Sequence, residues 1–578
     1  MSGGDLVARE LERQGVRFVF TLCGGHVSPI LVGAKHCGLT VVDVRHEATA
    51  VFAADATARL TGVPGVAVVT AGPGVTNTIT ALKNAQLAQS PLVLFGGATA
   101  TVLKGRGALQ DIDQRPLVKP HVKAAFFVER IRDLPRAVVD AFAVARSGVP
   151  GPVFVECPVD LLYPEAMVRS WYAAKTDRPA RNLAEALQKR YLAWHLDRTF
   201  KSPRRERDIE RAAVPPVAPS SGQVRKAATL LSKAKRPLLI LGSQAMSEPQ
   251  AAEEVAAAVV RLGVPVYLGG MARGLLGQAS RLQLRHERRS ALKEADLVLL
   301  AGFPSDFRLD YGSHVRGKTV IAVNRSAHDL RLNLRPTLGV LADPGLFLVA
   351  LAEAAGGEPE RFGSWLAELT GRDQAREAKI AADAASAPAG QGVNPLALCR
   401  AIEAGLPDAS VLVADGGDFV ATASYVVRPR APLCWLDPGA FGTLGVGAGF
   451  ALAAQLCRPG SEVWLLWGDG AAGLSLADFD TFARHRLPVI AVVGNDASWA
   501  QIAREQVEML GDAVGTELAR SDYHVAAQGL GGEGLLLTRP DQVEATLAEA
   551  RRLAAGGRPV LINAHLAKTD FRKGSLSM

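Results

Sequence analysis

The sequence has few cysteines, and none is placed to build a disulfide or zinc framework. Its 578 residues contain six of them: Cys23, Cys37, Cys157, Cys399, Cys434 and Cys457. No two follow C-x-x-C spacing, and no Cys/His cluster has the spacing of a zinc site. These absences exclude a disulfide scaffold and a zinc ribbon and indicate a reducing compartment. We therefore expect a cytoplasmic protein.

Segments that would suit a membrane are also scarce. The N-terminus lacks the basic-then-apolar pattern of a secretory signal. One uncharged run, residues 439–456, has eighteen residues but includes five glycines, which are poor helix formers. It is at the short end for a bilayer span. We expect no membrane span and interpret this run as a buried loop and helix beside a ligand.

Basic residues are in only mild excess. There are 65 Lys+Arg against 57 Asp+Glu, a net charge of +8. Over this length that balance does not indicate nucleic-acid binding, but it suits a small anionic ligand. Hydrophobic residues make up 48% and charged residues 21%, which excludes a disordered or fibrous chain.

Short apolar runs alternate with amphipathic, helix-length stretches along the whole chain. We expect strands at 18–22, 41–44, 66–70, 92–95, 153–157, 238–241, 264–268, 297–301, 320–323, 411–414, 463–467, 489–493 and 560–563. Continuous apolar strands that alternate with helices are typical of parallel sheets covered on both faces. The sequence predicts an α/β protein with three doubly wound parallel-sheet domains.

Composition shifts divide the chain. We expect a first domain at 1–165, a linker or insertion at 166–220, a middle domain at 221–371, an Ala-rich linker at 372–392 and a third domain at 393–578. Within the insertion, residues 184–200 predict a helix with two opposed apolar stripes. One stripe holds Leu187, Tyr191 and Trp194, and the other holds Leu192, Leu196 and Phe200. This favours a helix between protein surfaces over one lying on a membrane; a helix packed on its own subunit is the simpler alternative.

The clearest chemical signal lies in the last third. The strand at 463–467 is followed directly by Gly468-Asp469-Gly470, and the next expected strand leads into Asn495. Ligands bind at the carboxyl ends of parallel strands, so Asp469 and Asn495 can converge. A carboxylate and an amide oxygen suit a hard cation such as Mg²⁺ bridging to a phosphate. Glycines beside Asp469 let backbone N–H groups approach that phosphate.

This Gly-Asp-Gly, with Asn495 following 26 positions after Asp469, resembles the diphosphate motif of the thiamine-diphosphate-dependent enzymes. The resemblance implies thiamine diphosphate and Mg²⁺ as cofactors. It implies Asp469, Asn495 and the carbonyl of Ala497 as metal ligands. One departure is Gly494, which stands where the family usually has a first Asn.

The resemblance extends to the first third. Glu47 matches the family's glutamate that hydrogen-bonds the pyrimidine ring, although a glutamate starting a helix is also a common dipole partner. Residues 70–97 resemble the loop that faces the ring, which implies cofactor contacts from Pro73 and Asn77. The family's cofactor lies between the first domain of one subunit and the third of another. We therefore expect a homodimer or homotetramer.

Residues 437–454 resemble the region that bends the cofactor. Leu444 would lie between the two rings, and the carbonyl of Gly442 would accept from the amino group. The remaining cofactor contacts implied by the resemblance are Gly416, Gly417, Asp418, Phe419, Gly468, Gly470, Ala471 and Trp499.

The middle third resembles the branch of this family that handles coenzyme A thioesters, in the runs 269–278 and 285–312. That branch includes oxalyl-CoA decarboxylase and the 2-hydroxyacyl-CoA lyases. The implied substrate is an acyl-CoA, and the implied reaction cleaves a 2-hydroxyacyl-CoA to an aldehyde and formyl-CoA. Arg273, Arg285, Arg288 and Arg289 are candidates for binding its phosphates. Whether the middle domain binds coenzyme A, ADP or FAD is left open.

Two further catalytic candidates lie in the first domain. His26 follows the first strand and can move protons at neutral pH; the alternative is a loop histidine satisfied by backbone. Leu109-Gln110 stands where oxalyl-CoA decarboxylase has Tyr-Glu, which makes Gln110 a candidate.

The other functions that the sequence leaves open are acetolactate-type carboligation of keto acids, oxalyl-CoA decarboxylation and an inactive cofactor-binding scaffold. Arg504-Glu505 stands where acetolactate synthases have Trp-Glu, which weakens the first of these.

Overall fold

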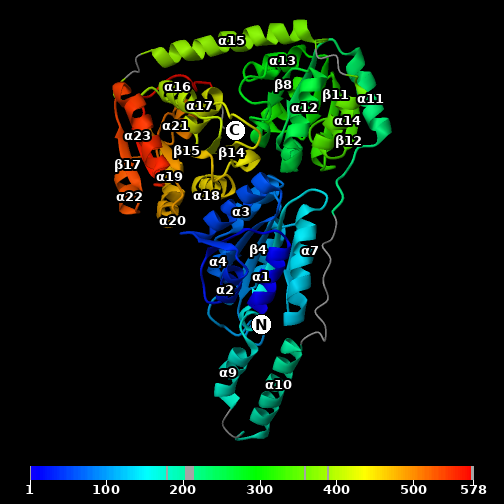
Figure 1. Cartoon of the computed structure of the whole chain (residues 1–578), viewed down its shortest axis with the longest axis vertical. Coiled ribbons are helices and arrows are strands. Elements are labelled where there is room, and N and C mark those ends of the chain that lie inside the picture. Colours follow the sequence, from blue (N-terminus) through cyan, green and yellow to red (C-terminus); the bar gives the residue numbers. More distant parts are fainter. Residues whose placement is uncertain (1, 177–179, 202–213, 357–359, 387–389, 575–578) are drawn as a thin grey trace. The chain divides into compact units, whose positions relative to one another are not determined.

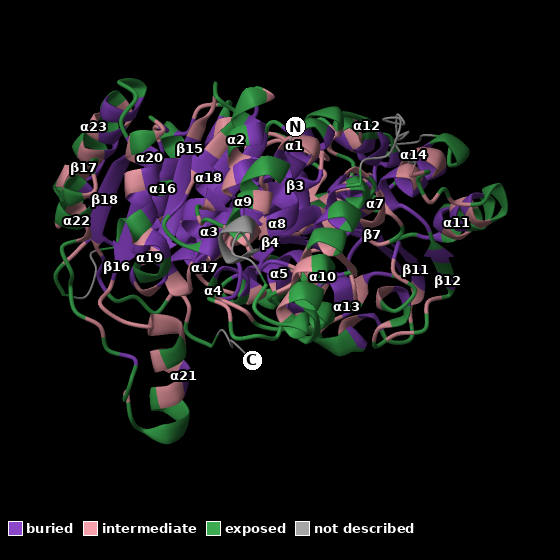
Figure 2. Cartoon of the chain, turned by 90° about the horizontal axis from the view of Figure 1, so that it is seen from below, coloured by how far each residue is buried: buried purple, intermediate pink, exposed green. Residues whose placement is uncertain are grey.

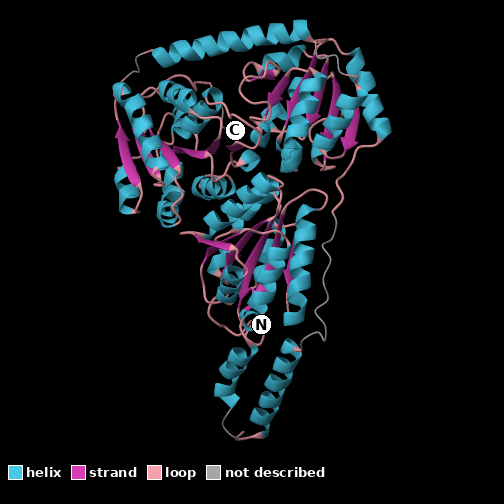
Figure 3. Cartoon of the chain, in the orientation of Figure 1, coloured by secondary structure: helices cyan, strands magenta, loops and turns pink. Residues whose placement is uncertain are grey.

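The computed structural model describes residues 2–176, 180–201, 214–356, 360–386 and 390–574. The chain divides into two compact units (Figure 1). The first consists of residues 1–58 and 63–215, and the second of residues 59–62 and 216–578. The first unit contains one parallel sheet and the second contains two (Figure 3).

The sheet of the first unit has the order β2-β1-β3-β4-β6-β5. Its strands are β1 (Phe18–Leu22), β2 (Thr40–Asp43), β3 (Gly65–Val69), β4 (Leu92–Ala98), β5 (Ala124–Phe127) and β6 (Pro152–Pro158). Its main helices are α1 (Gly3–Arg13), α2 (Ser28–His36), α3 (Glu47–Thr61), α4 (Pro73–Thr76), α5 (Ile79–Leu87), α6 (Gln114–Val118), α7 (Leu134–Arg146) and α8 (Val159–Leu162). Apolar residues of α1, α2 and α7 pack with β3, β4 and β6 into one core.

The first sheet of the second unit has the order β12-β11-β10-β7-β8-β9. Its strands are β7 (Pro237–Leu241), β8 (Val266–Leu268), β9 (Gln283–Leu284), β10 (Leu297–Ala301), β11 (Thr319–Asn324) and β12 (Leu338–Leu341). Around it lie α11 (Ser221–Lys233), α12 (Ala252–Leu262), α13 (Arg288–Glu294), the 3-10 segment η6 (Phe307–Val315), α14 (Pro344–Ala354) and α15 (Gly363–Ala385).

The second sheet of this unit has the order β14-β13-β15-β16-β18-β17. Its strands are β13 (Ser410–Asp415), β14 (Trp435–Leu436), β15 (Glu462–Gly468), β16 (Ile490–Asn495), β17 (Glu533–Leu537) and β18 (Val560–His565). Its helices are α16 (Pro395–Gly405), α17 (Asp418–Val426), α18 (Gly447–Cys457), α19 (Asp469–Ser475), α20 (Phe479–Arg484), α21 (Ala500–Leu510), α22 (Tyr523–Gly529) and α23 (Val543–Ala555).

All strand pairs within the three sheets are parallel, which confirms the predicted α/β class. The central strands are buried over nearly their whole length because helices cover the sheets (Figure 2). In the third sheet, β13, β15 and β16 are neighbours, with Gly468 paired to Gly494. Their carboxyl ends therefore lie side by side, where a doubly wound sheet binds ligands.

Two segments differ from the sequence expectation in detail. The expected linker 372–392 is helical as far as Ala385, because α15 continues through its Ala-rich part. The expected insertion forms a hairpin of α9 (Glu165–Thr176) and α10 (Leu183–Phe200); residues 177–179 and 202–213 lie outside the described residues.

The uncharged run 439–456 forms a 3-10 turn and the buried helix α18, as expected from the sequence. Among the described helices, none has both the length and the apolarity needed to cross a bilayer.

Candidate active site

Two buried oxygen atoms without partners mark the end of β15 and β16. Asp469 follows β15 directly, and Asn495 is the last residue of β16. Among the described residues, Asp469 Oδ2 and Asn495 Oδ1 make no hydrogen bond. The Asn495 amide nitrogen donates to Ser521 O at 3.2 Å and to Asn563 Oδ1 at 3.1 Å, which fixes the orientation of the amide. Buried oxygens without donors are costly, and this pair suits a hard cation.

The electrostatics at the ends of β15 and β16 also suit a cation. Burial and the neighbouring carboxylates of Asp469 and Asp418 raise the pKa of Asp496 to about 7. Burial raises the pKa of Asp469 as well, and the backbone N–H groups facing its carboxylate, including that of Ala497, counter part of the rise. Ala497 has a left-handed backbone (φ 57°), and its carbonyl accepts from Leu518 N at 2.8 Å with one lone pair left. The three expected ligands therefore lie at or just after the carboxyl ends of the neighbouring strands β15 and β16.

A cavity of about 650 Å³ opens at these strand ends. Every residue that the sequence predicted as a cofactor contact in the third domain lines it: Gly416, Gly417, Asp418, Phe419, Gly442, Leu444, Gly468, Gly470, Ala471 and Trp499. Phe307 and Tyr311 of η6 also line it, and sequence reasoning missed them. They lie in a distant segment, so no motif spacing could have found them.

Two glycines in the cavity wall are required by geometry. Gly416 has φ +145°, and a side chain there would bring Cβ within 2.7 Å of Gly468 N. A Cβ on Gly470 would lie 2.4 Å from the ring of Trp499. The indole of Trp499 therefore packs directly on the Gly-Asp-Gly turn in the wall of the cavity.

Asp415, which sequence reasoning also missed, fixes the loop that carries Leu444. It is buried at the end of β13, and its carboxylate accepts from the N–H of Gly447 at 2.8 Å, Gly445 at 3.1 Å and Trp467 Nε1 at 3.1 Å. Burial raises its pKa to about 6. A polar residue ending an otherwise apolar strand was the available signal.

The side chain of Asp418 forms an ion pair with Arg504. Arg504 of α21 donates to both of its oxygens, at 2.9 and 2.7 Å. Such a bidentate pair is a strong, directional contact. Asp418 can therefore offer a ligand its backbone, as predicted, while its side chain holds α21.

In the first unit, Glu47 begins α3 and is buried. Its Oε2 accepts from Asn77 Nδ2 at 3.0 Å, and Pro73 begins the short helix that ends just before Asn77. The structure therefore brings together Glu47 and Asn77, two of the residues predicted to contact the pyrimidine.

His26 and Gln110 are linked through Thr70, a residue that sequence reasoning did not single out as functional. His26 Nδ1 lies 3.1 Å from Thr70 Oγ1, which donates weakly to Gln110 Oε1 at 3.5 Å. If Thr70 donates to Gln110, it accepts from His26, which leaves Nε2 as the basic nitrogen. Burial lowers the pKa of His26, which favours the neutral imidazole.

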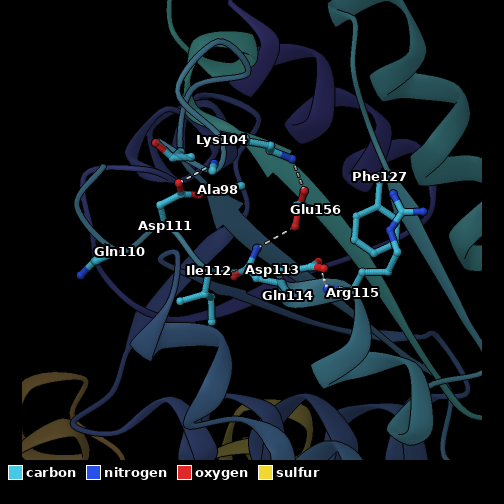
Figure 4. A pocket seen from close by; sticks show the side chains of 12 residues that line it. Ala98, Lys104, Gln110, Asp111, Ile112, Asp113, Gln114, Arg115, Phe127 and Glu156 are labelled. Atoms are coloured by element: carbon cyan, nitrogen blue, oxygen red, sulfur yellow. Dashed lines mark hydrogen bonds and ion pairs between the residues drawn. The ribbon is translucent and has the colours of Figure 1, made fainter. Parts of the chain in front are cut away.

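The loop carrying Gln110 borders a second cavity, of about 280 Å³ (Figure 4). Within it, Glu156 lies between Lys104, with which it forms an ion pair, and Gln114, which donates to it at 2.8 Å. Gln114 also donates to Gly97 O and accepts from Gly72 N, next to Pro73. Gln114, likewise missed from sequence, thus ties this loop to the end of β4 and the start of α4.

The three parallel sheets, with buried acid and amide oxygens at the strand ends of the third, form an arrangement that suits an anionic ligand at those strand ends. Comparisons with known proteins identify the class of protein. The N-terminal TPP (thiamine pyrophosphate) binding domain of thiamine pyrophosphate enzymes matches residues 1–117, the central domain residues 224–351 and the C-terminal TPP binding domain residues 415–564.

Relatives similar over the full length of the chain agree with the family models. The chain is 50% identical to 2-hydroxyacyl-CoA lyase 2 of Danio rerio over 589 residues, covering 100% of this chain and 93% of the relative. It is 50% identical to the Homo sapiens protein of that name over 591 residues, covering 100% and 92%. An acetolactate synthase large subunit of Mycobacterium tuberculosis is 34% identical over 573 residues, covering 97% and 95%. The chain belongs to the thiamine pyrophosphate enzyme family, and thiamine diphosphate is its cofactor.

Proposed function

We propose that this chain cleaves a 2-hydroxyacyl-CoA to an aldehyde and formyl-CoA, and that the same site can join the two in reverse. The relatives named 2-hydroxyacyl-CoA lyase 2, similar over the full length, support this reading over an acetolactate synthase. The observation that carries the choice of a coenzyme A thioester is an arginine-rich cavity in the second unit.

That cavity has a volume of about 660 Å³ and lies between the middle sheet and α17. Six arginines and one glutamate are among its lining residues; the arginines are Arg273, Arg285, Arg288, Arg289, Arg376 and Arg428. Burial lowers the pKa of Arg273, Arg285 and Arg288, so each loses hydration that an anion would replace. Arginine stays charged and matches phosphate geometry. The phosphates of coenzyme A fit this excess of positive charge.

Among the arginines of this cavity, Arg285 pairs with Glu377 at 3.0 Å and Arg428 with Glu403 at 2.8 Å, whereas Arg273 and Arg288 are held without carboxylates. Arg273 donates to Ser424 O at 3.0 Å and lies over the Trp435 ring, and Arg288 donates to Arg308 O at 2.8 Å. These contacts use backbone oxygens and a ring face rather than carboxylates. Positive charge therefore stays available to a ligand, and the side chains lose little further freedom on binding.

For the cofactor, we propose Asp469, Asn495 and the carbonyl of Ala497 as ligands of Mg²⁺, which would hold the diphosphate. Thiamine diphosphate, when bound, supplies the nucleophile and electron sink for breaking a bond beside a carbonyl. Glu47, oriented by Asn77, would exchange a proton with the pyrimidine ring of the bound cofactor. Leu444 sets the ring geometry from a loop fixed by Asp415. His26 Nε2 is one candidate for taking the substrate hydroxyl proton, with Gln110 positioned beside it through Thr70; the cofactor's own amino group is the other candidate.

Mass-spectrometric product analysis tests the reaction. The protein is supplied with Mg²⁺ and thiamine diphosphate, and a 2-hydroxyacyl-CoA and pyruvate are offered in separate tubes. We expect formyl-CoA, or formate from its hydrolysis, together with an aldehyde one carbon shorter. Acetolactate from pyruvate, with no cleavage of the thioester, would overturn the proposal.

Arg288→Gln is expected to raise KM for the acyl-CoA by about tenfold or more, because a hydrogen bond to a charged group contributes roughly 1.5–3 kcal/mol. The change should leave kcat nearly unaltered, since the phosphates lie away from the reacting carbon. Steady-state kinetics and calorimetric titration with free coenzyme A provide the readouts. Arg281→Gln, which alters a highly exposed arginine outside this cavity, is the matched control. Equal KM values in both variants would place the phosphates elsewhere.

A further inference from the structure

The hairpin of α9 and α10 presents an apolar face to solvent. The face, called here the outer face, consists of Leu183, Leu187, Tyr191 and Trp194 of α10, with exposed fractions of 77%, 59%, 53% and 53%. These positions share one side of the helix, and α10 is drawn mostly exposed in Figure 2. A continuous exposed patch of this kind, unlike scattered apolar residues, marks an interaction site.

The opposite apolar stripe of α10 is buried against α9. Leu196 and Phe200 are buried with Val168 of α9, and Ile131 and Tyr163 pack against them. One of the two apolar stripes predicted from sequence therefore packs on its own subunit, which agrees with the alternative of a helix packed on its own subunit. Within the described chain the other has no protein surface over it.

Polar contacts hold the hairpin in a defined position. His195 Nε2 lies 2.8 Å from Thr101 Oγ1, which donates to the buried Asp160. Arg169 of α9 donates to Asp197 of α10 at 2.9 Å, which joins the two helices. The outer face is thus displayed by an anchored element, so presenting it to a partner costs little conformational entropy.

Basic residues flank the outer face, together with one acidic residue, Asp197, which pairs with Arg169. Arg190 and Arg198 are exposed on the same side of α10, and Arg198 lies 5.4 Å from the ring centroid of Trp194. The described residues 165–176 and 180–201 contain seven Lys and Arg against three Asp and Glu, a net charge of +4.

We propose that the outer face docks on the surface of an anionic lipid bilayer; the sequence pattern favoured a place between protein surfaces, but only one apolar stripe remains exposed. Leucine, tyrosine and tryptophan beside arginines are the residues that settle at the boundary between headgroups and acyl chains. Each basic residue close to an anionic leaflet adds to the attraction. A symmetric contact between two copies of the chain would instead bring two such basic segments together, which charge repulsion opposes.

Vesicle flotation of the full-length protein tests this. We expect binding to vesicles of phosphatidylcholine with phosphatidylserine, weaker binding to phosphatidylcholine alone, and loss of binding at high salt. The double substitution Leu187→Glu with Trp194→Glu should lower the partition coefficient by at least about tenfold. Arg190→Glu with Arg198→Glu should lower it for the anionic vesicles. Val260→Glu with Val525→Glu, which alters two exposed apolar residues far from the hairpin in sequence, is the matched control.

Thermal unfolding of each variant shows whether it folds, and the arginine variant keeps the test valid if the apolar one does not. Wild-type protein that binds neither vesicle would overturn the proposal. So would equal binding by the outer-face variants and the control. Light scattering gives the oligomer mass of the Leu187→Glu, Trp194→Glu protein. If this mass falls and the wild type does not bind vesicles, the outer face is a contact between copies of the chain instead.

Discussion

Glu47→Gln is expected to reduce kcat by about 10²–10⁴-fold, the usual contribution of a positioned acid or base. Glutamine has nearly the same shape and can still accept from Asn77, so the start of α3 should keep its structure. It cannot share a proton with the pyrimidine. The pre-steady-state rate of deuterium exchange at the reactive carbon of the bound cofactor should fall by a similar factor, because this measurement isolates the proton relay from later steps.

Glu12→Gln, on α1 of the same unit, is the control and should leave both rates and the melting temperature unchanged. A kcat for Glu47→Gln within about twofold of wild type would show that Glu47 is only a helix-terminal charge, as a glutamate in the first turn often is.

Asp469→Asn is expected to affect the melting temperature differently in the metal-free protein and in the protein with Mg²⁺ and thiamine diphosphate. In the metal-free chain, the substitution removes a buried charge that crowds Asp496, so the melting temperature should stay equal or rise. With Mg²⁺ and thiamine diphosphate, the wild type should gain stability by mass action and the variant should gain far less. We expect cofactor affinity to fall by about 100-fold or more, since even outer-sphere changes at metal sites cost 10–100-fold. Differential scanning fluorimetry with and without the ligands measures both effects.

Asp480→Asn, in the partly exposed i,i+4 pair with Arg484, is the control for the loss of one acidic group. Equal Mg²⁺-dependent stabilisation of wild type and Asp469→Asn would remove Asp469 from the metal site.

Combining the two inactive chains tests the assembly expected from the family resemblance. If the first domain of one subunit completes a site with the third domain of another, a mixed dimer of Glu47→Gln and Asp469→Asn chains has one intact site. Random co-assembly should then restore about a quarter of wild-type activity. Co-expression with two affinity tags isolates the mixed dimer, which should have about half of wild-type activity. An inactive mixed dimer would mean that each site is built from one chain.

The central strands of each sheet could be predicted from sequence, whereas five of the six edge strands could not. All thirteen expected strands are present, and the five that were missed, β5, β9, β12, β14 and β17, each lie at the edge of a sheet. An edge strand is covered incompletely, so its sequence need not be a continuous apolar run: β12 alternates buried and exposed residues, and β5 is half-buried throughout. The strand ends that form the candidate site belong to central strands, which is why the site could be located.

Within the site, short-range motifs were predictable and long-range supports were not. Gly468 to Gly470 and Asn495 follow strands directly, so their positions come from local pattern. Asp415 acts on a loop 30 residues away, and Phe307 enters the cavity from the middle domain. Their roles depend on tertiary packing, for which a single sequence holds no spacing rule.

The contact between Gly470 and the Trp499 ring has a consequence for how this protein can change over evolutionary time. Because the ring occupies the place of a side chain at position 470, a mutation there alone collides with the indole. Shortening Trp499 first opens room for it, so the order of the two mutations matters. Lineages that keep tryptophan at 499 are expected to be held at glycine at 470, and a change at the second position should occur only on a background that has already lost the first.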